Sequence, residues 1–123
     1  MHHAPRVGIV LFHIIARSDW STAEDAGVYE PAGLGTEGFI HLSQRGQILR
    51  PANLLYAGRD DLVLLVIDPE RVEEPVVFEP GSHGESEDFP HLYGSLNVDA
   101  VIDVLDFPCE GNGSFVLPAG LPS

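Results

Sequence analysis

The sequence predicts a single α+β domain. Short segments rich in β-branched and aromatic residues, which are typical of strands, alternate with segments that carry helix start and stop signals. The chain has 123 residues, a length that supports one hydrophobic core and hardly a second. Its hydrophobic share of 44% and charged share of 20% are close to the globular average, so the chain can bury enough apolar surface to fold.

Two apolar segments predict strands in the interior of the domain. Residues 7–15 are rich in valine, isoleucine and leucine, and His13 interrupts their apolar pattern. Residues 62–67 are apolar at every position, as is typical of a strand that is buried on both faces. We therefore expect residues 62–67 in the middle of the sheet.

The segment between these two strands begins with a predicted helix. Residues 18–26 carry cap candidates and acidic residues in the first turns and end before Gly27, and we expect Trp20 to anchor this helix to the core. Residues 29–35 have the composition of a loop. Residues 38–43 then alternate with the two-residue period of a strand.

A second helix is expected over residues 44–57, because its apolar residues fall on one side and Gly58 follows it. Pro51 lies inside this stretch. A proline in a helix interior costs about 3 kcal/mol. We therefore expect a kink at this position or a break into two short helices.

The last part of the chain predicts three further strands and a tail. Strands are expected near residues 76–79, 89–93 and 100–107, with an exposed loop over 80–88. We assign residues 1–107, with a short N-terminal lead, to the single domain. Residues 108–123 form a tail rich in glycine and proline, in which an apolar patch around Phe115 can dock on the domain.

Composition excludes several classes of function. A formal net charge of −13 makes nucleic acids and anionic membranes poor partners, although acidity can also serve solubility alone. The chain has no lysine, which excludes Schiff-base chemistry and a Walker motif. A single cysteine excludes an internal disulfide. With no signal-peptide pattern and no apolar run near the ~20 residues of a membrane span, we expect a cytoplasmic protein.

Three histidines on separate strand-like segments are the main functional signal. They are His13 in Phe-His-Ile, His41 in Phe-Ile-His-Leu-Ser and His91 in Phe-Pro-His-Leu-Tyr-Gly. A histidine buried among large apolar residues is costly unless its ring nitrogens find partners. One such residue is commonly structural, whereas three favour a shared cleft in which they are catalytic. Their spacing matches no short metal-binding motif, so we expect no metal site.

Residues near these histidines extend the predicted site. Ser43 can cap the helix that follows it and Arg45 lies in the first turn, so the two can hold an anion, although a solvated surface arginine is the more ordinary interpretation. Glu79, at the end of a strand, can orient a ribose hydroxyl, act as a general base or be merely solvated. We expect Phe39 and Tyr93 to complete the ligand site.

The same residues resemble those of the domain of unknown function 952 family. The resemblance extends from about residue 9 to residue 107. Its most specific features are the following segments: Glu-Gly-Phe-Ile-His-x-Ser over 37–43, Ala-Gly-Arg-Asp-Asp-Leu-Val-Leu-Leu over 57–65, and Phe-Pro-His-Leu-Tyr-Gly over 89–94, together with His13 and Trp20.

The resemblance implies a compact fold similar to that of ADP-ribosyltransferases, with two small antiparallel sheets, two main helices and a cleft between the sheets. It implies that His13 holds the ribose of NAD and that His41 and Ser43 occupy the second-strand position. His91 and Tyr93 stand where that fold has a late strand-borne glutamate, and Glu79 is the nearest acidic residue.

These expectations leave several hypotheses about function. The first is an enzyme that binds NAD or a related nucleotide and acts at the nicotinamide–ribose bond, as an ADP-ribosyltransferase or an NAD glycohydrolase would. NAD would then be a substrate or ligand, and no cofactor is required. The alternative is a noncatalytic module that binds a small anionic metabolite. A third, a module that binds a protein partner, has little support in the sequence.

Overall fold

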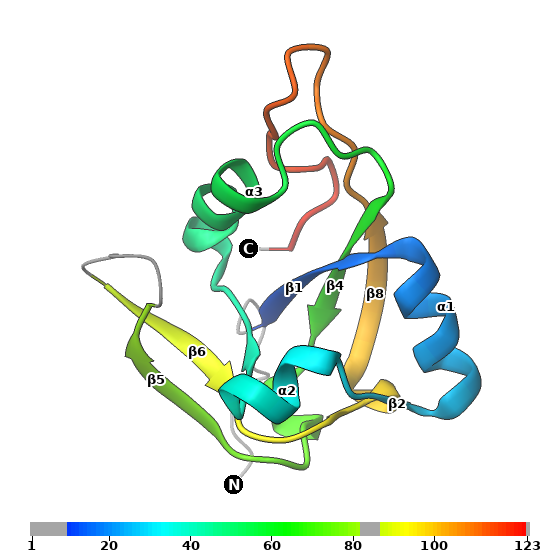
Figure 1. The fold of residues 1–123 in the computed structure, drawn as a ribbon, viewed down its shortest axis with the longest axis vertical. Coiled ribbons are helices and arrows are strands. Elements are labelled where there is room, and N and C mark those ends of the chain that lie inside the picture. Colours follow the sequence, from blue (N-terminus) through cyan, green and yellow to red (C-terminus); the bar gives the residue numbers. More distant parts are fainter. Residues whose placement is uncertain (1–9, 82–86, 123) are drawn as a thin grey trace, which may run out of the picture.

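The computed structural model describes residues 10–81 and 87–122. Within these ranges the chain forms small antiparallel sheets and a few short helices, so the predicted α+β class is confirmed (Figure 1). One three-stranded sheet has the strand order β1 (Leu11–Ala16), β4 (Leu62–Ile67) and β8 (Val101–Asp106). Residues 7–9 of the first expected strand lie outside the described residues.

The second three-stranded sheet has the order β3 (Ile40–His41), β6 (Asp88–Leu92) and β5 (Val76–Pro80). A third sheet, which the sequence did not predict, pairs the two-residue strands β2 (Val28–Tyr29) and β7 (Leu96–Asn97). In Figure 1 the β5–β6 pair extends away on the left, while β1, β4 and β8 lie side by side on the right. Of the predicted loop 80–88, residues 82–86 lie outside the described ones.

Strand β4 is the centre of the larger sheet, as predicted. It pairs with β1 on one side and β8 on the other, and all six of its residues are buried. Its alternating side chains enter two different hydrophobic clusters, with Leu65 in one and Leu64 in the other. Apolar residues at every position are therefore required because both faces of this strand are covered.

Helix α1 (Arg17–Ala26) confirms the first predicted helix. Trp20 is buried in the same cluster as Leu65 and anchors the helix to the sheet. The helix ends at Gly27, which has a φ of 81° and donates its backbone N–H to the carbonyl of Ala23. A left-handed residue at this point is the usual way in which a glycine ends a helix.

Helix α2 (Ala32–Glu37) corrects the loop predicted over residues 29–35. Its sequence, Ala-Gly-Leu-Gly-Thr-Glu, contains two glycines, which disfavour a helix in isolation. The turn is held instead by tertiary contacts, because Leu34 packs against the cluster that contains Trp20. The helix ends at Gly38 (φ 87°) and places Glu37 just before β3.

The helix predicted over residues 44–57 is broken into two pieces. A 3-10 turn, η1 (Arg45–Gln47), precedes helix α3 (Leu49–Leu55), so the break falls before Pro51. Pro51 is the third residue of α3, where a backbone N–H has no partner within the helix. Its missing N–H therefore costs no helical hydrogen bond.

Two further 3-10 turns lie in the second half of the chain. They are η2 (Pro69–Arg71), which follows β4, and η3 (Val98–Ala100), which leads into β8. The side chain of Asp68 caps η2 by accepting a hydrogen bond from the backbone N–H of Glu70 at 2.9 Å. This agrees with the turn signal of Asp-Pro in the sequence.

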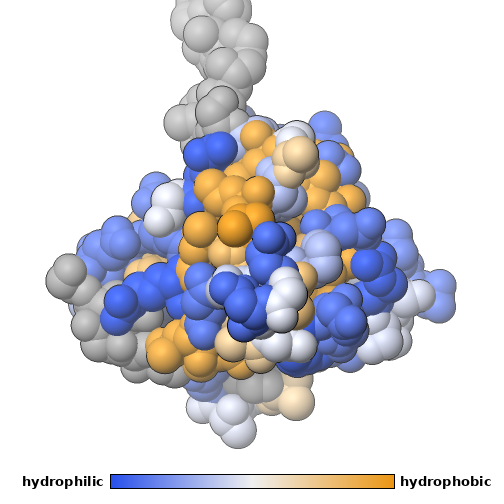
Figure 2. Space-filling view, turned by 90° about the horizontal axis from the view of Figure 1, so that it is seen from above, coloured by the Kyte–Doolittle hydropathy of each residue, from blue (hydrophilic) through white to orange (hydrophobic). Residues whose placement is uncertain are grey.

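The C-terminal segment is part of the hydrophobic core. Phe115 is 3% exposed, its ring stacks on Phe107 with centroids 4.8 Å apart, and its backbone N–H donates to Asn53 of α3 at 2.7 Å. The expected docking of this patch is therefore confirmed. Seen from above, a band of hydrophobic residues crosses a face that is otherwise largely hydrophilic (Figure 2). Exposed apolar side chains include Leu54 of α3 and Val116 of the C-terminal segment.

We expect Phe115→Ala to lower the free energy of unfolding by about 3–5 kcal/mol, because it removes a buried aromatic ring from the second cluster. The matched control is Val116→Ala, whose side chain is 53% exposed and should cost less than about 0.5 kcal/mol. Urea unfolding followed by circular dichroism measures both. Equal effects of the two substitutions would show that the tail does not contribute to the core.

Candidate functional site

A pair of backbone hydrogen bonds joins the two larger sheets and positions the site. The N–H of Phe12 in β1 donates to the carbonyl of Ser43 at 2.8 Å, and the N–H of Ser43 donates to the carbonyl of Phe12 at 2.8 Å. Ser43 thus forms an isolated β-bridge with Phe12, outside β3. The prediction that it caps the following helix is wrong, because η1 is capped by Gln44, which forms a capping box with Gln47.

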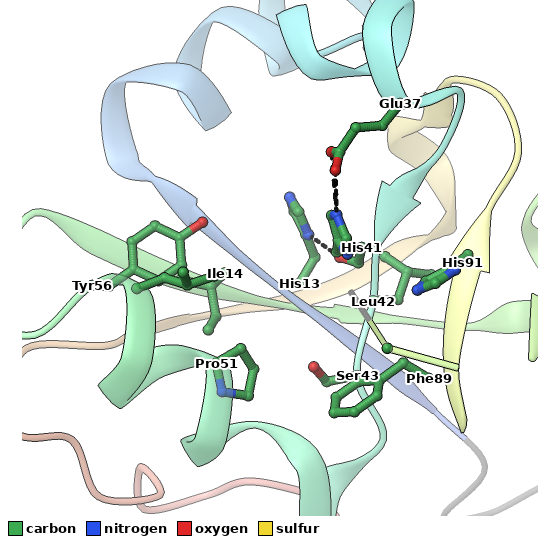
Figure 3. Close-up of a pocket in the computed structure, with 12 residues that line it drawn as sticks. His13, Ile14, Glu37, His41, Leu42, Ser43, Pro51, Tyr56, Phe89 and His91 are labelled. Carbon is green, nitrogen blue, oxygen red and sulfur yellow. Dashed lines mark hydrogen bonds and ion pairs between the residues drawn. The ribbon is translucent and has the colours of Figure 1, made fainter. Parts of the chain in front are cut away.

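A cavity of about 290 Å³ lies beside this junction. Its wall combines histidines with apolar side chains, and Figure 3 shows how they surround it. The lining residues are His13, Ile14, Glu37, His41, Leu42, Ser43, Pro51, Leu55, Tyr56, Gly81, Phe89 and His91. We call it the first cavity. It brings together residues from β1, β3, β6, α2 and α3.

His13 is held in one tautomer by a backbone carbonyl. Its Nδ1 lies 2.7 Å from the carbonyl oxygen of His41, and because a carbonyl only accepts, Nδ1 carries the proton. Its Nε2 is then an acceptor, and this atom is buried without a hydrogen-bond partner. Burial lowers the pKa of His13 to about 4, and the neighbouring imidazole of His41 adds to this, against the hydrogen bond. The ring is therefore neutral at pH 7.

His41 stands at the rim of the first cavity and is held by Glu37. Its Nε2 lies 3.2 Å from one carboxylate oxygen of Glu37 and 3.3 Å from the other. Both side chains are partly exposed, at 42% and 48%. Figure 3 shows the rings of His13 and His41 next to each other, with Glu37 above them. The carboxylate of Glu37 is thereby fixed at the mouth of the cavity.

His91 lies at the end of a polar network on β5 and β6. Its Nδ1 donates to Oε2 of Glu79 at 2.7 Å, and the hydroxyl of Tyr93 donates to the same oxygen. These hydrogen bonds, that of Tyr93 first, lower the pKa of Glu79, and the carboxylate raises the pKa of Tyr93. The side chain of His91 is only 3% exposed, and its Nε2 has no partner.

Phe39 fixes the rings of this part of the site. It stacks on His91 with ring centroids 4.1 Å apart and an angle of 16°, and it meets His41 edge-on at 4.9 Å. Tyr93 lies 5.3 Å away on a tilted plane. Stacked and edge-on contacts of this kind favour these orientations of the neighbouring imidazoles.

A second cavity of about 260 Å³ continues the first. The two share five residues: His13, Ile14, Glu37, His41 and Tyr56. The second cavity adds Asp19, Tyr29 and Arg59, and Phe39 forms part of its wall. Burial raises the pKa of Tyr29 to about 12, with a smaller contribution from Asp19, so its hydroxyl stays a hydrogen-bond donor. Burial also raises the pKa of Tyr56.

The structure thus brings most of the predicted site residues together. His13, His41, His91 and Ser43 line the first cavity, and Phe39 lines the second. Glu79 and Tyr93 support His91 from behind. Arg45 lies apart from both, in a separate hollow. That hollow is lined by Val10, Leu11, Gln44, Arg45, Pro69, Glu74, Val76 and Phe78.

Three residues of the site were missed by reasoning from the sequence. Glu37 lies four residues before His41 in the sequence, but this spacing brings the two side chains together only because α2 ends at Glu37. Tyr29 and Tyr56 were placed in a loop and on a helix face, and nothing in their local sequence connects them to His13, whose ring lies 5.5 Å from that of Tyr29.

The charges around the two cavities are mainly negative. Glu37 is the one carboxylate among the described residues that line the first cavity, and no arginine lines it. In the second cavity Arg59 is exposed and paired with Asp61 at 2.6 Å. Among residues 10–81 and 87–122, no group of three or more His, Cys, Asp or Glu side chains is arranged to hold a metal ion. No helix in the described part of the chain could cross a membrane.

Fold and site define a small α+β protein with three histidines around one cavity at the junction of two sheets. The chain belongs to the family described as Protein of unknown function (DUF952), whose model matches residues 14–104. The resemblance stated from the sequence is therefore confirmed at the level of this family.

Solved structures of the protein CC0527 from Caulobacter crescentus are similar to this chain. The crystal structure of CC0527 matches with a TM-score of 0.78 at 32% sequence identity, and the match covers 88% of this chain and 94% of the CC0527 chain. The solution structure of CC0527 matches with a TM-score of 0.77 at 32% sequence identity, and the match covers 91% of this chain and 96% of the CC0527 chain. No match was found among curated proteins.

We expect the stability of the protein to depend on His13 at mildly acidic pH. In the unfolded chain His13 binds a proton near the ordinary histidine pKa of 6.5, whereas in the folded protein it does so near 4. The contribution of neutral His13 to the unfolding free energy is therefore fully present above pH 6.5 and is lost as the pH falls toward 4. Between about pH 7.5 and about pH 5, the wild type should lose roughly 2 kcal/mol more unfolding free energy than His13→Gln.

Urea unfolding of both proteins at the two pH values measures this difference, and the other titrating groups cancel because both proteins contain them. An equal loss of stability in the two proteins would show that His13 is accessible to protons in the folded state.

Proposed function

We propose that the two cavities bind NAD or a related nucleotide and that the protein acts at the nicotinamide–ribose bond. The ribose lies against His13 and His41 in the first cavity, and the remainder of the nucleotide extends into the second. NAD is a substrate in this proposal, and no further cofactor is required.

The observation that carries the proposal is the unpartnered Nε2 of His13. Since Nδ1 holds the proton, Nε2 offers a buried lone pair that needs a hydroxyl or amide donor. A sugar hydroxyl supplies such a donor without bringing a charge into a buried site. A phosphate at neutral pH is mainly an acceptor and would meet the lone pair unfavourably.

Glu37 gives the site a reason to act on a ribosyl bond. When nicotinamide leaves the ribose, positive charge moves onto the sugar ring. A carboxylate held at the mouth of the cavity by His41 stabilises that charge, and it also favours the pyridinium of the intact substrate. Glu37 therefore takes the part that the missing strand-borne glutamate plays in the ADP-ribosyltransferase fold.

The resemblance to that fold supports the same assignment. It expects a first-strand histidine to hold the ribose of NAD, and His13 is on the first strand in the described part of the chain. Tyr29 and Tyr56, which both line the second cavity, offer aromatic faces for a nucleobase or the nicotinamide ring.

The alternative of an anionic metabolite has less support. It relied on Arg45 and on a helix start after Ser43, but Arg45 lines a different hollow and η1 is a single 3-10 turn. The arginine that does reach the cavities, Arg59, is already paired with Asp61. In the first cavity a free carboxylate or phosphate would therefore meet Glu37 without a compensating cation, whereas the ribose of a nucleotide brings no charge to that cavity.

A thermal-shift screen with NAD, ADP-ribose and nicotinamide tests the proposal. A ligand present at a hundred times its Kd stabilises the folded state by about 2.7 kcal/mol, which raises the unfolding midpoint by several degrees. We expect NAD and ADP-ribose to raise the midpoint of the wild type. His13→Ala should remove the shift, because the ribose loses its acceptor.

Arg45→Ala is the matched control and should keep the full shift, since its side chain lies outside both cavities. The midpoint of each variant without ligand shows that it is folded. No shift of the wild type at millimolar ligand, or a full shift in His13→Ala, would contradict the proposal.

A further inference from the structure

The polar network of Glu79, His91 and Tyr93 is not used by the ribose contacts described above. The register of β5 and β6 explains why these three residues meet: Val77 is opposite His91, so Glu79 lies diagonally across from His91 on the same face, and Tyr93 is two residues further on. Strand pairing alone thus places a carboxylate behind the imidazole.

This network fixes the chemistry of the imidazole. An ionised carboxylate can only accept, so Nδ1 of His91 holds its proton toward Glu79, at 2.7 Å. The neutral ring then has its lone pair on Nε2, and Phe39 stacked at 4.1 Å fixes the plane of the ring. Nε2 is buried in a side chain that lines the first cavity, and it has no partner.

A histidine oriented in this way is arranged as a base. A carboxylate that sets the tautomer, an imidazole with one fixed plane and an unpartnered nitrogen in a cavity wall are the parts that activate a nucleophile. A residue selected for packing at the same place would be apolar, because an unpartnered buried nitrogen opposes folding. The network therefore points to proton transfer in the same cavity that holds Glu37.

We propose that His91, positioned by Glu79, is the general base that activates water, so that the protein hydrolyses the nicotinamide–ribose bond rather than transferring the ribosyl group to another molecule. This inference rests on the proposed function. It adds the second substrate, water, and the residue that acts on it. His91 is the catalytic residue, Glu79 is a positioning residue, and Tyr93 holds the carboxylate of Glu79.

In this step water replaces nicotinamide at the ribose. The bond between ribose C1′ and the nicotinamide nitrogen breaks, and its electron pair stays on nicotinamide, which leaves neutral. A water oxygen forms the new bond to C1′, and the water proton passes to Nε2 of His91. The imidazolium formed is stabilised by the carboxylate of Glu79. The proton then returns to solvent, and the products are nicotinamide, ADP-ribose and a proton.

Nicotinamide release from NAD, followed by liquid chromatography, tests the proposal with the full-length protein. We expect His91→Gln and Glu79→Gln each to lower kcat by at least about 100-fold, the ordinary contribution of a general base. KM for NAD and the thermal shift with ADP-ribose should stay close to the wild-type values, because neither residue holds the ribose. Glu24→Gln, which removes an exposed acid on α1, is the matched control and should leave kcat unchanged.

Long-range ¹H–¹⁵N correlation of the imidazole nitrogens provides a readout that a purely structural role would not give. We expect the neutral ring of His91 in the wild type to carry its proton on Nδ1. In Glu79→Gln, where the amide can also donate, a population with the proton on Nε2 should appear.

The outcomes separate this inference from the proposed function. Binding of ADP-ribose without release of nicotinamide overturns the assignment of His91 and leaves the binding proposal standing. Turnover by Glu79→Gln within about threefold of the wild type, or a proton found on Nε2 in the wild type, also overturns it. Absence of binding by NAD and ADP-ribose overturns both proposals together.

Discussion

The hydrogen bonds between β1 and the segment that ends at Ser43 are the constraint on which the site depends. Two backbone bonds between Phe12 and Ser43 fix one sheet against the other, and the next residue along β1, His13, donates to the carbonyl of His41. Because these bonds are adjacent, the joint between the sheets and the tautomer of His13 are set by the same local geometry. Any shift in the pairing of the sheets would move the acceptor nitrogen of His13.

Around this joint, the three histidines contact two kinds of acceptor. His13 donates to a backbone carbonyl, His41 contacts Glu37 at the rim, and His91 donates to Glu79. The three rings are therefore not equivalent. Burial lowers the pKa of His13 and keeps its ring uncharged at neutral pH, whereas His41 and His91 each contact a carboxylate. Such differences support the proposal that one cavity holds a ligand and moves a proton.

Much of the fold could be predicted because its signals are local. The apolar run that became β4, the helix of Trp20 and the strands that carry the three histidines depend on composition and period within a few residues. The misses depend on distant contacts. Helix α2, in a stretch predicted to be a loop, contains two glycines and is held by packing of Leu34. The unpredicted strands β2 and β7 pair across segments that are far apart in the chain.

The sequence by itself determined the residue types at the centre of the site, since three histidines in apolar strand segments are visible without coordinates. Only the tertiary structure decided which atoms face one another. In the tertiary structure Arg45 lies outside both cavities, Glu37 lines the first cavity, and the carboxylate of Glu79 accepts a hydrogen bond from Nδ1 of His91. The physical reason is that strand register and the ends of short helices are set by packing between segments far apart in the chain, and one residue of shift turns a side chain to the opposite face.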